Sequence, residues 1–144
     1  MRTFIAYLSY SGNTEEIAQY LEAKLDHMGI DVDMHEIGLD IIPDLSQYDT
    51  VFLGTFTWDY GATPDEVKDF ILDVGYKPDN MAIFGSGDTQ FGGEELYCKA
   101  VDKLVKFYNS SCPGLKIEQS PRGMQEELID EWLEGVLENV PQYA

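Results

Sequence analysis

The fold of this chain is indicated first by Phe4-Ile5-Ala6-Tyr7-Leu8 and by the run that follows it, Ser9-Tyr10-Ser11-Gly12-Asn13-Thr14. The apolar residues predict a buried strand, and the segment from Glu15 has the pattern of a helix. Small and hydroxyl residues at such a junction leave backbone N–H groups beside the positive end of the helix dipole. Because residues 9–14 contain no Lys or Arg, we expect this first loop to hold a phosphate with amides and hydroxyls alone.

Strand-like and helix-like segments alternate along all 144 residues. Strands are predicted at 3–9, 31–37, 48–54, 81–85 and 115–117, and helices at 14–28, from Pro64, after residue 93 and at 125–139. This alternation predicts one α/β domain, residues 1–144, with a five-stranded parallel sheet between two layers of helices. For five such strands we expect the order 2-1-3-4-5, with residues 31–37 at one edge.

The chain is strongly acidic, with 27 Asp and Glu against 9 Lys and Arg and a net charge of −18. This charge disfavours nucleic acid and anionic membranes as partners and favours basic protein surfaces. No apolar run is long enough to span a bilayer and no leader segment is recognised, so we expect a cytoplasmic protein. Cys98 and Cys112 are expected to be packed thiols, and His27 and His35 to be surface residues; no metal site is predicted.

In a sheet of this order the ligand lies at the carboxyl ends of the strands, where the strand order reverses. This rule selects the first loop together with the loops after the third and fourth strands. The second loop, residues 55–64, is rich in aromatic side chains, and its Trp58 suits stacking on an aromatic ligand.

The third loop, residues 85–93, is rich in glycine, which lets a backbone approach a flat ligand closely. Asp88 is a candidate acceptor for a ring N–H, and Phe91 is a candidate second wall. The three loops together predict a site for a flat heterocycle that carries one phosphate.

Four motifs of the chain resemble the flavodoxins of the short-chain type, and the resemblance covers essentially the full length. They are Ser9-Tyr10-Ser11-Gly12-Asn13-Thr14, Gly54-Thr55-Phe56-Thr57-Trp58, Gly85-Ser86-Gly87-Asp88 and Tyr97-Cys98-Lys99-Ala100-Val101-Asp102. The resemblance implies a flavodoxin-like three-layer sandwich, non-covalent FMN, and electron transfer rather than catalysis. It also implies a monomer that exchanges electrons with basic-surfaced proteins, namely a flavodoxin reductase and acceptor metalloenzymes.

The resemblance assigns the FMN phosphate to the first loop, one ring face to Trp58, the other face to Phe91, and the ring edge to residues 85–88. The cofactor-binding residues implied are Ser9, Tyr10, Ser11, Gly12, Asn13, Thr14, Thr55, Phe56, Thr57, Trp58, Asp59, Tyr60, Gly61, Gly85, Ser86, Gly87, Asp88 and Phe91. Carboxylates near this site are expected to lower the potential of the fully reduced couple. The candidates are Asp59, Asp65, Glu66, Asp88, Glu94 and Glu95.

Two departures from the flavodoxin pattern keep other functions open. Asp59-Tyr60 stands where the family has Gly-Asp, so we expect the one-electron form of the flavin to be less stabilised than in a typical flavodoxin. Phe91-Gly92-Gly93 also resembles the flavodoxin-like activators of class Ib ribonucleotide reductases. Two further alternatives are a flavin-free interaction module and an FMN-dependent reductase with its own substrate.

Overall fold

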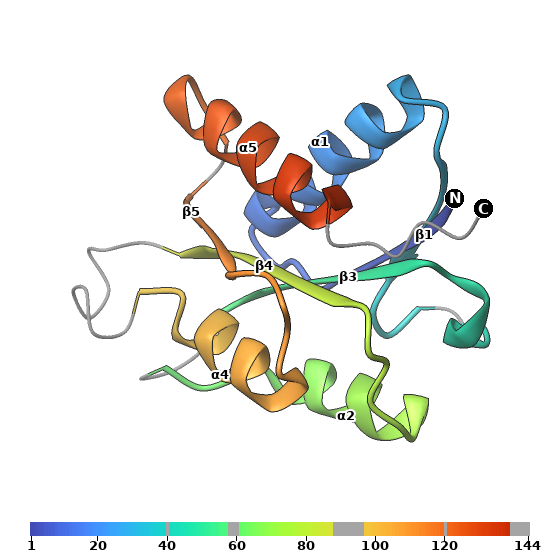
Figure 1. Cartoon of the computed structure of the whole chain (residues 1–144). Helices are drawn as coiled ribbons and strands as arrows, with labels where there is room; N and C mark the ends of the chain where they lie inside the picture. Colours follow the sequence, from blue (N-terminus) through green and yellow to red (C-terminus); the bar gives the residue numbers. More distant parts are fainter. Residues whose placement is uncertain (40, 58–60, 88–96, 120, 139–144) are drawn as a thin grey trace.

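The computed structural model describes residues 1–39, 41–57, 61–87, 97–119 and 121–138. Five parallel strands form one sheet in the order β2-β1-β3-β4-β5 (Figure 1). The strands are β1 (Arg2–Tyr7), β2 (Asp31–Glu36), β3 (Thr50–Phe56), β4 (Met81–Gly87) and β5 (Leu115–Glu118). The predicted α/β class, strand order and edge position of residues 31–37 are therefore confirmed.

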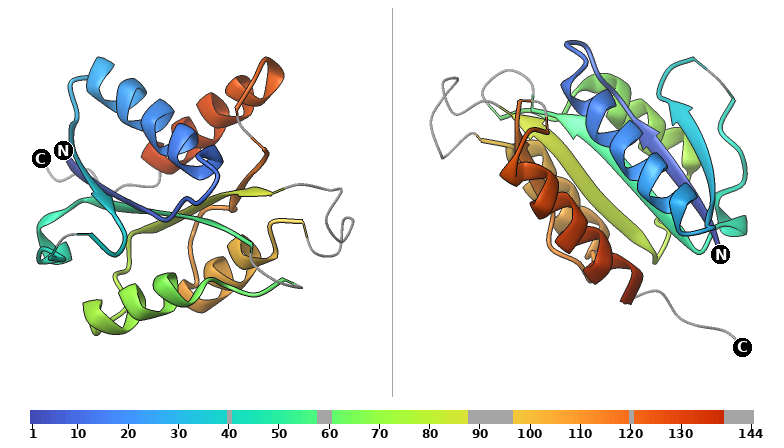
Figure 2. Two further views of the ribbon diagram at one scale, coloured as in Figure 1. Left: turned by 180° about the vertical axis from the view of Figure 1, so that it is seen from behind. Right: turned by 90° about the horizontal axis from the view of Figure 1, so that it is seen from above.

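Helices cover both faces of the sheet, as the sequence predicts (Figure 2). One face carries α1 (Asn13–His27) and α5 (Met124–Glu138), and the other carries α2 (Asp65–Val74) and α4 (Lys99–Tyr108). A 3₁₀ turn, η1 (Leu45–Gln47), interrupts the connection from β2 to β3. Among the described residues, no helix has the length and apolar character needed to cross a membrane.

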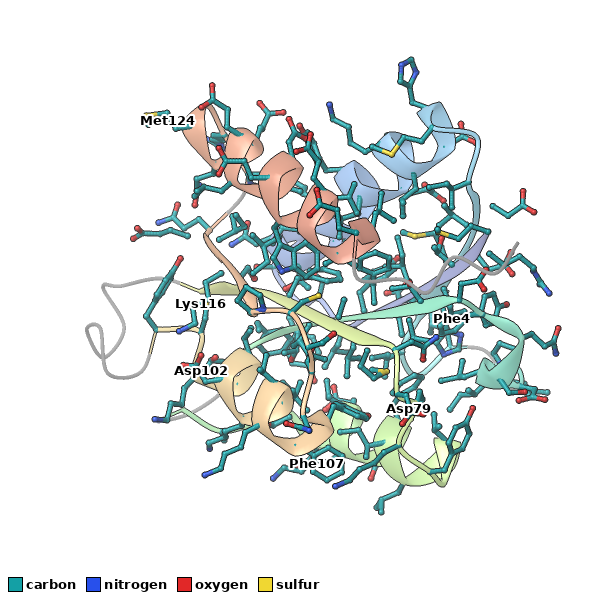
Figure 3. The ribbon with its side chains drawn as sticks, in the orientation of Figure 1. Phe4, Asp79, Asp102, Phe107, Lys116 and Met124 are labelled. Carbon is teal, nitrogen blue, oxygen red and sulfur yellow. The ribbon has the colours of Figure 1, made fainter. Side chains whose placement is uncertain are left out.

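Two apolar cores lie between the sheet and its helices, because successive side chains of a strand point to opposite faces. Phe4 and Ala6 pack with α2 and α4, whereas Ile5 and Tyr7 pack with α1 and α5. Figure 3 shows side chains filling the space between the layers, and it places Lys116 of β5 beside Asp102 of α4. Their Nζ and Oδ2 atoms are 2.9 Å apart.

The third and fourth strands extend further toward the predicted ligand site than the sequence indicated. Thr55 pairs with Gly85, and Phe56 pairs with Ser86. Thr55, Phe56, Ser86 and Gly87 were predicted as loop residues but belong to strands, because each strand supplies the hydrogen-bond partners that prolong the other. The beginning of the second and third loops is thus a rigid sheet end.

His35, which the sequence predicted at the surface, is buried. Its ring lies 5.6 Å from the ring of Phe4 and 5.9 Å from the ring of Phe70, measured between centroids. Although β2 is an edge strand, α2 covers this part of it. Cys98 and Cys112 are buried and form no disulfide, which agrees with the prediction of packed thiols.

Candidate functional site

The first loop turns sharply at Gly12 before α1 begins. Gly12 has φ +94°, a conformation that other residues rarely adopt, and a Cβ placed there would meet no atom of the described residues within 4 Å. The hydrogen-bond ladder of α1 starts where Glu16 N donates to Gly12 O, so the preceding amides point out of the helix end. Gly12 N–H itself donates to Ser9 Oγ at 3.1 Å, which fixes the curvature of the loop. Open space beside helix amides is the geometry that a phosphate requires.

The end of the first loop is anchored to the end of β4. Thr14 Oγ1 lies 2.7 Å from Ser86 Oγ, and both side chains are buried. This contact brings together residues of the first and third loops that are 72 positions apart in the sequence. Ser11, in contrast, is exposed, and its hydroxyl is turned toward solvent rather than packed in the core.

Tyr10 connects the first loop with β3 and α2. Its ring packs against Phe56 with 4.8 Å between centroids, and its hydroxyl donates to Glu66 of α2. The ring remains 59% exposed, so it lies over the end of β3 rather than in the core. The sequence placed Glu66 among the carboxylates near the site, but it did not indicate the hydrogen bond to Tyr10.

The second loop is held by α4 at its start. Ala100 N–H, in the first turn of α4, donates to Thr57 Oγ1 at 3.0 Å, so Thr57 caps a helix that is distant in sequence. Thr55 is fully buried and donates to Phe56 O. Gly61 is buried and has φ +93°, a left-handed conformation that favours glycine.

The glycines of the third loop that the structure describes serve close packing within the protein. A Cβ at Gly85 would lie 2.4 Å from Val101 Cγ2 and 2.5 Å from Thr55 O. A Cβ at Gly87 would lie 2.9 Å from Cys98 Sγ. The sequence suggested that these glycines let the backbone approach a ligand. They also let α4 pack closely against the sheet.

Sequence reasoning missed Gln119, which follows β5. Its backbone N–H donates to Gly87 O at 2.7 Å, and it has φ +59°, a left-handed conformation that is uncommon outside glycine. Gln119 thereby fixes the end of β4 at the candidate site. No local sequence signal marks it, because the contact depends on β5 lying beside β4.

Burial dominates the titration of the groups around this sheet end. It raises the pKa of the Cys98 thiol to about 11, and it raises the pKa of Tyr97 as well. Burial and the neighbouring Glu15 likewise raise the pKa of Tyr7. All three groups are neutral at physiological pH, so they add no charge to the site.

Five of the expected cofactor-binding residues lie outside the described residues: Trp58, Asp59, Tyr60, Asp88 and Phe91. The other expected residues gather at the carboxyl ends of β1, β3 and β4. The contacts Thr14–Ser86 and Tyr10–Phe56 bring the three loops together at one end of the sheet.

Comparison with known proteins identifies this architecture. The family model for flavodoxin matches residues 5–132. This chain belongs to the flavodoxin family. A curated relative, probable flavodoxin 2 of Bacillus subtilis, is 36% identical over 135 residues, which cover 88% of this chain and 87% of the relative.

Solved flavodoxin structures superpose over nearly the whole chain. Flavodoxin 2 of Bacillus cereus has 33% identity and a TM-score of 0.79, covering 96% of this chain and 99% of its own. A short-chain flavodoxin associated with a bacterial microcompartment has 25% identity and a TM-score of 0.85, covering 98% and 99%. The resemblance to short-chain flavodoxins is therefore confirmed.

Flavodoxins are electron carriers that bind FMN, so FMN is the cofactor of this family. The described residues fit its phosphate, because the first loop combines an open turn at Gly12, the first amides of α1 and hydroxyl side chains. Such a neutral cradle can hold an anion by hydrogen bonds and the helix dipole.

Proposed function

We propose that this protein is a monomeric, cytoplasmic electron carrier that takes electrons from a flavodoxin reductase and delivers them to acceptor metalloenzymes. The observation that carries the proposal is the buried contact between Thr14 and Ser86, which sets the first loop against the sheet end in a flavodoxin-family chain. Neither Cys98 nor Cys112 forms a disulfide, which fits a reducing compartment.

FMN supplies the redox chemistry, and the chain binds and orients it. In this proposal the amides at the start of α1 and the Ser11 hydroxyl hold the phosphate, while Thr14 is held in place by Ser86. Thr57 and Gly61 position the second loop beside the ring, and Gly85 to Gly87 form the sheet end next to its edge. Tyr10 covers the side of the site that faces α2 through Phe56 and Glu66.

The cofactor assignment has a direct test. The purified protein should be yellow, should release FMN on denaturation, and should bind FMN again after refolding. The variant Gly12→Val should lose FMN affinity, because the left-handed turn is strained by a β-branched residue. A colourless protein that cannot be reconstituted with FMN would leave the flavin-free interaction module as the better description.

The partner assignment follows from the charge of −18, which speeds the approach of basic surfaces. The rate of reduction by a basic flavodoxin reductase should fall as salt rises, because screening weakens this attraction. A rate that is independent of salt would contradict charge-guided docking. Sedimentation should show a single species with the mass of one chain.

The reductase activator remains the alternative proposal, and the sequence features that favour it lie outside the described residues. Reduced protein mixed under oxygen with a manganese-loaded small subunit of a class Ib ribonucleotide reductase separates the two functions. The carrier should leave that subunit inactive, whereas an activator would generate its active form. Steady consumption of a nicotinamide donor by the isolated protein would instead indicate a reductase with its own substrate.

A further inference from the structure

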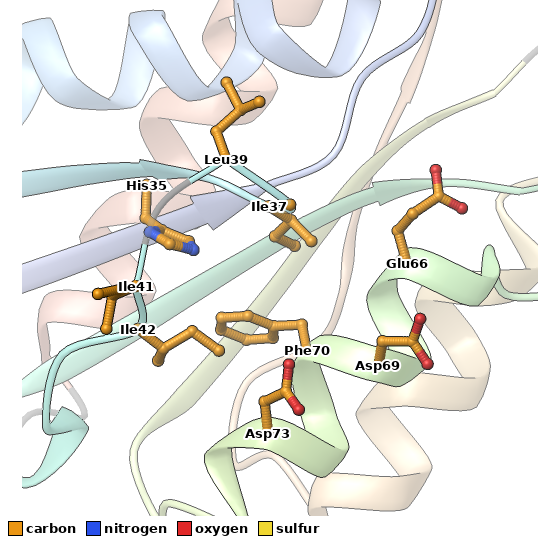
Figure 4. Close-up of a pocket in the computed structure, with 10 residues that line it drawn as sticks. His35, Ile37, Leu39, Ile41, Ile42, Glu66, Asp69, Phe70 and Asp73 are labelled. Carbon is orange, nitrogen blue, oxygen red and sulfur yellow. The ribbon is translucent and has the colours of Figure 1, made fainter.

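A groove of about 630 Å³ lies between the connection that follows β2 and helix α2 (Figure 4). Its apolar side is formed by Leu39, Ile41 and Ile42, with Phe70 of α2 at its base. Leu39 is 71% exposed and Ile41 is 95% exposed, which is unusual for large aliphatic side chains placed close together. Glu66 connects this groove with the candidate FMN site through its hydrogen bond with Tyr10, but no residue that lines the groove is among the expected cofactor-binding residues.

The opposite side of the groove is acidic. Glu66, Asp69 and Asp73 lie on one stripe of α2, because residues three, four and seven apart share a helix face. Figure 4 shows these carboxylates on the α2 side of Phe70 and the isoleucines on the other. The ion pairs between described residues, Arg2–Asp33, Lys24–Asp130 and Lys116–Asp102, all lie elsewhere.

This stripe is costly to the isolated helix. Like charges at three- and four-residue spacing repel each other and destabilise a helix. Lys68 is the single basic residue in the sequence of α2, and it is not among the residues that line the groove. A cationic occupant would remove this repulsion while covering the exposed aliphatic side chains.

We propose that the groove that Leu39, Ile41 and Ile42 form with α2 is a docking site for a basic amphipathic helix of a partner protein. Lysine or arginine side chains on one flank of that helix would pair with Glu66, Asp69 and Asp73, and its aliphatic stripe would pack on Leu39, Ile41 and Ile42. This is the helix-in-groove form of recognition, here with an acidic rim.

Charge selects this occupant over the others. A second copy of the chain would bring another 27 acidic residues to an acidic groove, and nucleic acid or an anionic membrane would also be repelled. The segment 139–144 contains no Lys or Arg, so it cannot pair with the acidic stripe. A basic helix is the chemistry that satisfies both sides of the groove.

Glu66 gives this docking site a link to the first loop. Its carboxylate accepts a hydrogen bond from the Tyr10 hydroxyl. A partner cation that pairs with Glu66 would therefore contact the same carboxylate as Tyr10 of the first loop. The docking chemistry itself does not depend on FMN, and the test below reads the two separately.

The test uses two peptides of about 18 residues, equal to about five helical turns, made only of Leu and Lys. In the first peptide the leucines form one helical stripe flanked by lysines; the second has the same composition with the stripe destroyed. Binding to the full-length protein is measured by fluorescence anisotropy at fixed salt, and the contact site is mapped by amide chemical shifts. FMN absorbance is recorded for every variant.

The striped peptide should bind more tightly than the scrambled one and should shift amides of residues 39, 41 and 42 and of α2. Asp69→Asn with Asp73→Asn should weaken its binding by about tenfold, the effect of losing about two exposed ion pairs. Ile41→Gln should weaken it by about fivefold through lost apolar contact. All these side chains are exposed, so folding is not at risk.

Matched controls decide whether the effect is specific. Glu127→Gln with Glu131→Gln removes the same charge at the same spacing from exposed positions of α5, and Leu72→Gln removes an exposed leucine from α2 outside the groove. Neither should change binding by more than about twofold, as expected for screened, distant charges.

Equal weakening by the control pair, or equal binding of the two peptides, would overturn the proposal in favour of non-specific attraction. Sedimentation that shows a dimer, converted to a monomer by Ile41→Gln, would assign the groove to a second copy instead. Loss of FMN binding with peptide binding intact would refute the proposed function and leave this site standing.

Discussion

The hydroxyl of Thr14 lies 2.7 Å from the hydroxyl of Ser86, and both residues are buried where the first loop meets the end of β4. The contact fixes the position of the first turn of α1 relative to the sheet. It therefore connects the stability of the fold with the geometry of the phosphate site.

Thr14→Val should destabilise the protein and weaken FMN binding. The valine keeps the shape of threonine but leaves Ser86 Oγ buried with one partner fewer, at a cost of about 1–3 kcal/mol in the free energy of unfolding. Urea denaturation and FMN titration measure the two effects. The double variant Thr14→Val with Ser86→Ala should be less destabilised than the sum of the single variants; additive effects would contradict a direct contact.

Thr3 and Thr50 are paired across β1 and β3, and both are buried. Substitution by valine should change the free energy of unfolding in opposite directions at the two positions. Thr50 Oγ1 has no hydrogen-bond partner among the described residues, so Thr50→Val should raise the free energy of unfolding by about 1 kcal/mol. Thr3 Oγ1 donates to Asp31 O at 2.9 Å, so Thr3→Val should lower it by a similar amount. Equal effects of the two changes in denaturant titrations would refute this assignment.

Gly54 and Gly135 form a second pair of opposite sign. A Cβ at Gly54 would lie 2.3 Å from Cζ of Phe84, so Gly54→Ala should lower the free energy of unfolding by about 1–3 kcal/mol through overpacking. A Cβ at Gly135, inside α5, would meet nothing within 4 Å in the part of the chain that the structure describes. Gly135→Ala should therefore raise stability by about 0.5–1 kcal/mol. Thermal unfolding of both variants measures the difference, and a stabilising Gly54→Ala would show that β3 and β4 can separate at no cost.

Cys98 should make the stability of the protein fall in mildly alkaline solution. Its pKa is 9.0 in the reference state, and burial raises it to about 11 in the fold. Between these values the unfolded chain loses the proton while the folded chain keeps it, so the free energy of unfolding declines as pH rises. The contribution is fully present below the lower value and lost as pH passes the upper one.

The measurement is urea denaturation across this pH range for the wild type and for Cys98→Ala. The variant should show a shallower decline than the wild type, whatever its stability at neutral pH. Cys112→Ala controls for the loss of one thiol. An unchanged slope in Cys98→Ala would assign the alkaline decline to the buried tyrosines, among them Tyr108, whose pKa burial raises to about 12.

Local patterns in the sequence were sufficient for the architecture of this protein. The alternation of apolar strands with helices led to the parallel sheet and its order, because crossover connections between parallel strands have one hand and few topologies satisfy it. The first loop indicated a phosphate site for the same local reason, since Gly12 and the start of α1 are neighbours in the chain.

Strand ends and side-chain partners could not be predicted in this way. The sequence predicts Thr55 and Ser86 in loops, because neither neighbourhood is strongly apolar. Each residue lies in a strand, because the adjacent strand supplies its hydrogen-bond partners. His35 was expected at the surface because its strand alternates with acids, and α2 buries it instead. The sequence predicts that Gly85 and Gly87 let the backbone approach a ligand, whereas the side chains nearest to them are those of Val101 and Cys98.

The sequence by itself determined the fold class, the family and the place of the cofactor loops, because these depend on periodicity and on residues adjacent in the chain. Only the tertiary structure decided which groups lie together: Thr14 with Ser86, Tyr10 with Glu66, and the exposed Leu39 and Ile41 in one groove with the acidic residues of α2. Contacts between residues far apart in sequence depend on how the layers pack, and no local pattern records that packing.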